Sequence, residues 1–126
     1  MPLAALTTFR QHLAAGQVEF EDTLALIDQL YHYTPTRFRN GVAGDEVASE
    51  AGQNEGSCRI FAFALLNGLS PDETLNCFGR HYRDVLATPN GSDHANIRTF
   101  QRHGWAGIHF DHPALTPRSS HDSDPA

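Results

Sequence analysis

Hydrophobic residues recur every three or four positions over most of the chain, the spacing that places them on one face of a helix. Five stretches show this pattern: residues 3–15, 21–34, 56–67, 70–88 and 93–103. The third stretch is the most hydrophobic, so it is expected to form the central helix; its stripe consists of Cys58, Phe61, Ala62, Leu65 and Leu66. The fourth opens on Ser70-Pro71-Asp72-Glu73, a capping box with proline at the first helical position.

Two short segments have the character of strands rather than helices. Residues 36–40 precede an Asn-Gly turn, and residues 106–110 alternate small or polar with apolar positions. We expect these two segments to pair as a small sheet, with residues 42–54 forming a loop. The predicted fold is therefore a helix-rich α+β single domain of about five helices over residues 1–112. Ser, Asp, Pro and His dominate residues 113–126, which we expect to be a disordered tail.

Composition narrows the possible functions mainly by exclusion. The 126 residues include nine arginines and no lysine, which excludes Schiff-base chemistry and a Walker-type phosphate site. The net charge of −6 disfavours nucleic-acid binding, and no apolar run reaches the length of a membrane span. A Gly-x-Gly-x-x-Gly motif is absent, so no cofactor is expected. With no signal peptide and only two cysteines, the chain is expected to carry free thiols in a reducing cytoplasm, and we expect a monomer.

Cys58 is the residue that most resembles a catalytic group. It lies in the first turn of the predicted central helix, where backbone N–H groups and the helix dipole stabilise a thiolate. A cysteine hydrolase also needs a histidine base, a residue that orients it and an oxyanion donor. The candidate base is His94 or His103, the candidate orienting residue is Asn96 or Asp93, and the candidate oxyanion donor is Gln53. The alternative is that Cys58 is a core residue, the commoner role of a buried cysteine.

The histidines are numerous, but their spacing predicts no metal site. Four of the eight lie close together near the end of the predicted domain: His94, His103, His109 and His112. No His-Glu-x-x-His or paired Cys-x-x-Cys occurs, so these histidines are expected to lie at the surface. Asp93 is expected to cap the helix that follows it.

Three segments together resemble the HopJ type III effector family. They are Tyr33–Gly41, Ala51–Ala64, which contains Asn-Glu-Gly-Ser-Cys, and His94–Phe110, which contains Gly-Trp-x-Gly. The resemblance covers about residues 3–110 and implies a small single-domain bacterial protein with no assigned biochemical activity. The family name also implies delivery into a host cell through type III secretion. The first residues, however, predict an ordered amphipathic helix instead of a serine-rich flexible leader.

Two hypotheses of function follow from these observations. The first is a domain that binds a protein partner or a small molecule through a surface rich in polar residues; the candidate residues are Asn54, Glu55, Ser57, His94 and Asn96. The helix start near residues 54–58 offers N–H donors for an anionic group. The second is a hydrolase or acyltransferase in which Cys58, His94 and Asn96 carry the chemistry. The sequence does not decide whether the protein is an enzyme.

Overall fold

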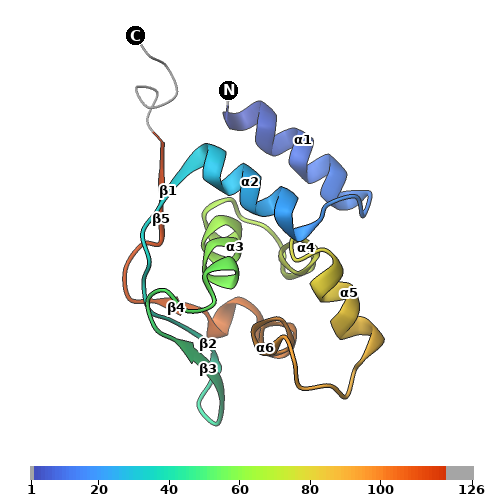
Figure 1. Ribbon diagram of the computed structural model, residues 1–126, viewed down its shortest axis with the longest axis vertical. Coiled ribbons are helices and arrows are strands. Elements are labelled where there is room, and N and C mark those ends of the chain that lie inside the picture. The colour runs from blue at the N-terminus through green and yellow to red at the C-terminus, as the bar shows by residue number, and fades with distance from the viewer. Residues whose placement is uncertain (1, 119–126) are drawn as a thin grey trace.

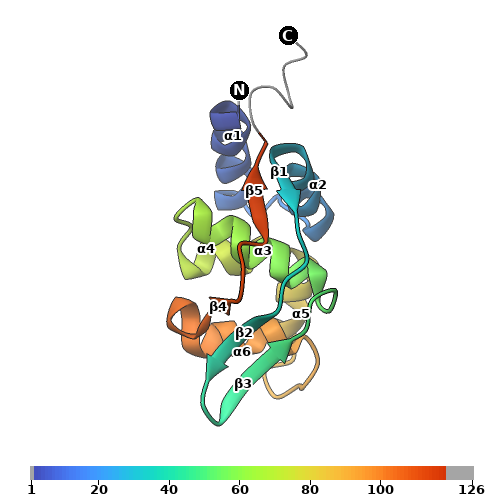
Figure 2. The ribbon, with the colours of Figure 1, turned by 90° about the vertical axis from the view of Figure 1, so that its left-hand side faces the viewer.

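The computed structural model describes residues 2–118 and has a helical layer with two small antiparallel sheets on one side of it (Figures 1 and 2). The order along the chain is α1 (Pro2–Ala14), α2 (Phe20–Leu30), β1 (Tyr31–Tyr33), β2 (Phe38–Val42), β3 (Asp45–Ser49), α3 (Glu55–Leu66), α4 (Pro71–Asn76), α5 (Arg80–Ala87), α6 (Ala95–His103), the 3-10 turn η1 (Gly104–Gly107), β4 (His109–Phe110) and β5 (Leu115–Pro117). The expected α+β class is confirmed. Within the described range, none of the helices combines the length and hydropathy that a membrane-spanning helix needs.

Helix α3 is the centre of the fold, as its hydrophobic stripe predicts (Figure 1). Ile60, Phe61 and Phe63 are fully buried, and the ring of Phe61 packs against the rings of Phe38, Phe78 and Phe100 at centroid distances of 5.0–6.3 Å. Each such buried side chain contributes roughly 1.5–3 kcal/mol through the hydrophobic effect. The end of the stripe departs from expectation. Leu65 and Leu66 are more than half exposed, because the helix reaches the surface in its last turn.

The strands form a three-stranded sheet of order β3-β2-β4 and a separate pair, β1-β5. The predicted pairing of the two extended segments is confirmed by Phe38 opposite Phe110 and Arg39 opposite His109. The second segment is shorter than expected, because residues 104–107 form η1 instead of strand. Gly107 lies directly against Gly41 there; a Cβ on Gly107 would come within 2.6 Å of the Gly41 backbone nitrogen.

Several element boundaries differ from the sequence-based expectation. Residues 45–49, expected to be loop, form β3 along the whole of β2. The helix expected over residues 21–34 ends at Leu30, and β1 follows before Pro35. The helix expected over 70–88 divides into α4 and α5 at Gly79, whose φ of 57° is outside the helical region. The capping box itself is confirmed: the Glu73 backbone N–H donates to Ser70 Oγ over 3.1 Å, and the Ser70 N–H donates to Glu73 Oε1 over 2.9 Å.

The chain remains part of the packed structure beyond residue 112. Strand β5 pairs with β1 by placing Leu115 opposite Tyr33, and Leu115 is only 3% exposed. The Arg118 backbone N–H then donates to the carbonyl of Leu30 over 2.9 Å. The expected tail boundary at 112/113 is therefore too early, because Leu115 has a buried position that the polar composition around it conceals. Residues 119–126 of the expected tail lie outside the described residues.

Candidate functional site

A cavity of about 430 Å³ opens where the starts of α2, α3 and α6 meet α5 and β3. Its lining consists of Phe20, Val47, Asn54, Gly56, Ser57, Phe78, His81, His94, Ala95, Asn96 and Ile97. Four of the residues singled out in the sequence line it: Asn54, Ser57, His94 and Asn96. They come from segments about forty residues apart, and the fold brings both segments to one cavity.

Two helices begin at this cavity with the same unusual backbone. Asn54 precedes α3 at φ 50°, and His94 precedes α6 at φ 52°, both in the left-handed region. Among the residues that the structure describes, no other non-glycine residue has a positive φ. Neither side chain caps its helix, and the first N–H groups of a helix have no partner within it. The first turns of both helices line the cavity, so these N–H groups and two positive dipole ends lie at its wall.

Asn96 is held in place from behind the cavity. Asn40, which is fully buried on β2, donates from its Nδ2 to the Asn96 backbone carbonyl over 2.8 Å and to Asn96 Oδ1 over 3.0 Å. Asn96 is 6% exposed, and within residues 2–118 its Nδ2 has no hydrogen-bond acceptor. Because Asn96 lines the cavity, this nitrogen is a donor available to a bound molecule. Asn54 is fixed in a similar way by donating from Nδ2 to Ser49 Oγ over 2.9 Å.

The apolar wall of the cavity is built around Phe20. Its ring stacks with Phe78 at 6.4 Å and contacts the edge of the His81 ring at 4.9 Å. A Cβ on Gly56 would lie 2.5 Å from Phe20 Cζ, so the absence of a side chain at residue 56 allows this ring to reach α3. Phe20 therefore joins α2, α3 and α5 and sets the position of His81.

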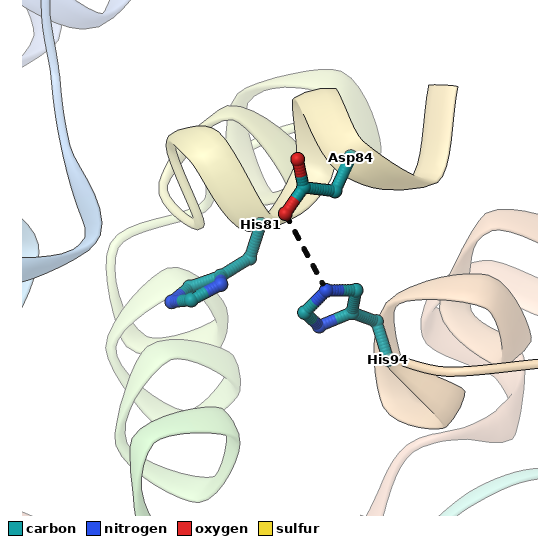
Figure 3. Close-up of side chains that lie close together, drawn as sticks. All are labelled: His81, Asp84 and His94. Carbon is teal, nitrogen blue, oxygen red and sulfur yellow. Dashed lines mark ion pairs between the residues drawn. The ribbon is translucent and has the colours of Figure 1, made fainter. Parts of the chain in front are cut away.

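His81, Asp84 and His94 form a cluster at the cavity in which one ligand atom from each residue lies within 4.8 Å of the others (Figure 3). The Nε2 atom of His94 is 3.7 Å from Asp84 Oδ2, and the two imidazole rings are 5.3 Å apart. His81 and Asp84 are three residues apart on α5, the spacing that places two side chains on one helix face. This cluster contains the residues best suited to hold a metal ion in the described part of the chain.

The start of α5 is fixed by α2. Glu19 accepts a hydrogen bond from the Arg80 backbone N–H over 3.0 Å and pairs with Arg83 at 2.7 Å. The Arg83 guanidinium is the main cause of the lowered pKa of Glu19. Gly79 approaches α2 so closely that a Cβ there would lie 2.7 Å from the Phe20 backbone nitrogen. This close contact and the positive φ of Gly79 end the first helix and let α5 begin in a new direction at residue 80.

The loop that carries His94 is fixed by Arg98, which is 6% exposed. Its guanidinium donates to the Thr88 carbonyl at 2.7 Å, to the Asp93 carbonyl at 2.6 Å and to Asp93 Oδ1 at 2.8 Å. The same hydrogen bond to Arg98 lowers the pKa of Asp93. Asp93 was expected to cap the helix, but His94 is the residue before α6, and the Asp93 carboxylate binds Arg98 instead.

Cys58 lies away from the cavity and is not part of its lining. It is 1% exposed, and burial raises the pKa of its thiol to about 11. The polar groups that act on this thiol are the Thr36 backbone and the Tyr33 side chain, on the strand side of α3. A nucleophilic thiolate needs a lowered pKa and access to substrate, and this environment supplies neither. The structure therefore groups His94 with Asn96, and leaves Cys58 in the core.

The remaining candidate residues are also placed outside the cavity. Glu55 is not part of the cavity lining, and after burial it contributes to the raised pKa of the Tyr33 phenol. Gln53 uses its Oε1 to accept from the Glu50 backbone N–H over 3.0 Å. His103 forms a direct 2.6 Å hydrogen bond with Asp45 on the hairpin, and His109 and His112 are exposed.

Sequence reasoning missed His81 and Asp84. Both lie on the polar side of a helix that is recognised by its apolar positions. Neither shares a predicted helix with His94. A usable signal was the His-x-x-Asp spacing at 81–84, which directs an imidazole and a carboxylate to the same side. Nothing in the sequence alone indicates that the loop after α5 returns His94 to that side.

The features described define a small, helix-rich α+β domain with a cavity of mixed polar and apolar lining between helix starts. Its sequence matches the family described as HopJ type III effector protein over residues 6–115, and the chain belongs to that family. A crystal structure of a protein of unknown function, VPA0580, is 47% identical, with a TM-score of 0.83; the match covers 90% of this chain and 93% of the other. No curated protein matches the chain.

Proposed function

We propose that the protein binds a small organic anion, a molecule with a carboxylate or phosphate group and an apolar body, in the cavity of about 430 Å³. The observation that carries this proposal is the meeting of two helix starts, α3 and α6, with the unpaired Asn96 amide donor on the first turn of α6. Helix N-termini bind anions because their N–H groups point outward and their dipoles favour negative charge. The volume is typical of small-molecule sites.

The two halves of the cavity suit the two parts of such a molecule. Ser57 and Asn96 add side-chain donors to the backbone N–H groups and would hold the anionic group. The large apolar side chains of the wall are those of Phe20, Val47, Phe78 and Ile97. Both left-handed residues, Asn54 and His94, keep the donors in place at a conformational cost, which is common at ligand sites.

The test is an NMR titration of the ¹⁵N-labelled full chain with inorganic phosphate and phenyl phosphate in buffer containing EDTA. We expect saturable shifts of the backbone amides of residues 55–57 and 95–97, with phenyl phosphate binding more tightly because it also contacts the apolar wall. Absence of saturable shifts at these amides with either probe would overturn the proposal.

A charge variant sharpens the same test. Ser57→Glu places a carboxylate in the first turn of α3, where the helix dipole favours negative charge. The same carboxylate would occupy the anion site and repel a bound phosphate. We expect this variant to fold and to lose phosphate binding. Thr116→Glu is the matched control, since it adds the same charge at an exposed position on β5. Equal binding by both variants would contradict the site assignment.

The cysteine-dependent reaction is the competing hypothesis, and the cavity favours ligand binding over it because Cys58 is outside the lining. Location forms a separate part of the proposal. The description of the family is that of type III effectors, which suggests a secretion-related role. Fusion of the full chain to a translocation reporter tests it: signal in host cells that requires an intact secretion apparatus supports delivery, and no signal leaves the bacterial cytoplasm as the site of action.

A further inference from the structure

We propose that His81, Asp84 and His94 bind a first-row divalent transition-metal ion at the edge of the cavity (Figure 3). Two imidazoles and one carboxylate form a ligand set that such ions prefer, and three protein ligands leave positions open for water or a bound molecule. Both histidines line the cavity, so the open positions would face its interior.

The distances leave room for an ion. Three atoms no more than 4.8 Å apart have a common centre within about 2.8 Å of each. Metal–nitrogen and metal–oxygen bonds in zinc sites are about 2.0–2.2 Å long. Side-chain rotations that move each ligand atom by less than about 1 Å would therefore bring all three to bonding distance of one ion. The His94–Asp84 separation of 3.7 Å is too long for a hydrogen bond, so the two groups lie together without satisfying each other.

A histidine–aspartate pair at the β2–β3 hairpin has a different geometry. His103 Nε2 contacts Asp45 Oδ2 at 2.6 Å, and Arg102 occupies both oxygens of the same carboxylate at 2.8 and 2.9 Å. Both oxygens of that carboxylate therefore already have close hydrogen-bonding partners. No arginine pairs with Asp84 in the described residues, and this carboxylate faces two imidazoles instead.

The ligands are positioned before any ion binds. The Phe20 ring packs against His81, and α5 is anchored to α2 through Glu19. Arg98 secures the loop, so that His94 keeps its left-handed backbone and reaches toward α5. Supporting groups of this kind orient metal ligands and raise affinity. Asp93 Oδ2, 3.8 Å from His94 Nε2, adds negative charge beside the cation.

Metal binding is tested directly, by calorimetric titration of Zn²⁺ into the full chain after treatment with EDTA and dialysis. We expect one equivalent to bind, and Co²⁺ in its place to give the visible absorption bands of nitrogen and oxygen coordination. Asp84→Asn and His94→Asn are expected to lower affinity more than about 100-fold, since changes to supporting residues alone cost 10–100-fold. Asparagine at 94 keeps a residue that tolerates the left-handed backbone.

Two matched controls exclude adventitious binding. His109→Gln and Asp28→Asn change exposed residues of the same types elsewhere, and both are expected to bind Zn²⁺ like the parent chain. Absence of stoichiometric binding, or equal losses in the controls and the cluster variants, would overturn the proposal. The phosphate titration is run in EDTA, so anion binding and metal binding can fail separately.

Discussion

Asn54 and His94, forty residues apart in the sequence, have nearly the same left-handed backbone and line the same cavity. Each directly precedes a helix, and each is a non-glycine residue in a conformation that costs about 1 kcal/mol or more. The strain is maintained by the surroundings: Ser49 holds the Asn54 amide, and Arg98 holds the loop before His94. At this cavity, therefore, the conformational cost of two left-handed residues is accepted, and the starts of α3 and α6 are held in a defined arrangement.

The first prediction concerns the stability of this arrangement. Asn54→Ala removes the hydrogen bond to Ser49 and places alanine in the left-handed region, where asparagine is tolerated better. We expect the free energy of unfolding to fall by about 1–3 kcal/mol, as measured by urea denaturation. Asn90→Ala, in the exposed loop before α6, serves as control and should change it by less than about 0.5 kcal/mol. Equal effects of the two substitutions would contradict the interpretation.

The second prediction concerns the cysteines. Burial raises the pKa of Cys58 to about 11 and that of Cys77 to about 12, so almost no thiolate forms near neutral pH. Iodoacetamide at pH 7.5 should leave both thiols unmodified in the native protein and label both after denaturation, as followed by peptide mass spectrometry. Rapid native labelling confined to Cys58 would instead support the cysteine-dependent enzyme.

The third prediction is a pH dependence at the hairpin. Hydrogen bonds from Arg102 and His103 lower the pKa of Asp45 from 3.8 to about 2. A carboxylate with a lowered folded-state pKa stabilises the fold above its unfolded pKa, and this contribution disappears as the pH falls through the folded value. Asp45→Asn should therefore unfold at lower urea concentration than the parent chain at pH 6, and the difference should shrink between about pH 4 and pH 2. A difference that is constant over this range would refute the assignment.

These expectations also show which features a sequence can specify. The capping box at Ser70 and the buried stripe through Phe61 depend on neighbours within one helix turn, so local pattern was sufficient. The break at Gly79 depends on contact with Glu19 and Phe20, about sixty residues away, and a glycine within a helical pattern does not by itself predict it. Strand β3 is similar: its alternation is weak, and β2 supplies the pairing that makes it a strand.

The candidate site divides in the same way. Asn54, Ser57, His94 and Asn96 were noticed because their segments carry more polar groups than packing requires, and all four line the cavity. Their role as ligand-binding residues stays a prediction. His81 and Asp84 were missed because their significance arises only when the loop fixed by Arg98 returns His94 to α5. Tertiary structure, not residue type, creates this cluster.

The fourth prediction tests the wall of the cavity at Gly56. In an ordinary helix, Gly→Ala stabilises by up to about 1 kcal/mol, and the φ of Gly56 is not in the left-handed region, so the backbone permits alanine. The new Cβ, however, would lie 2.5 Å from Phe20 Cζ and 3.1 Å from Cε1, and this ring also packs on Phe78 and His81. Gly56→Ala should therefore destabilise by about 1–3 kcal/mol in urea denaturation and weaken Zn²⁺ binding by displacing His81. Gly56→Ala combined with Phe20→Leu removes the clash and should recover part of the stability; a single variant more stable than the parent chain would show that the ring moves aside freely.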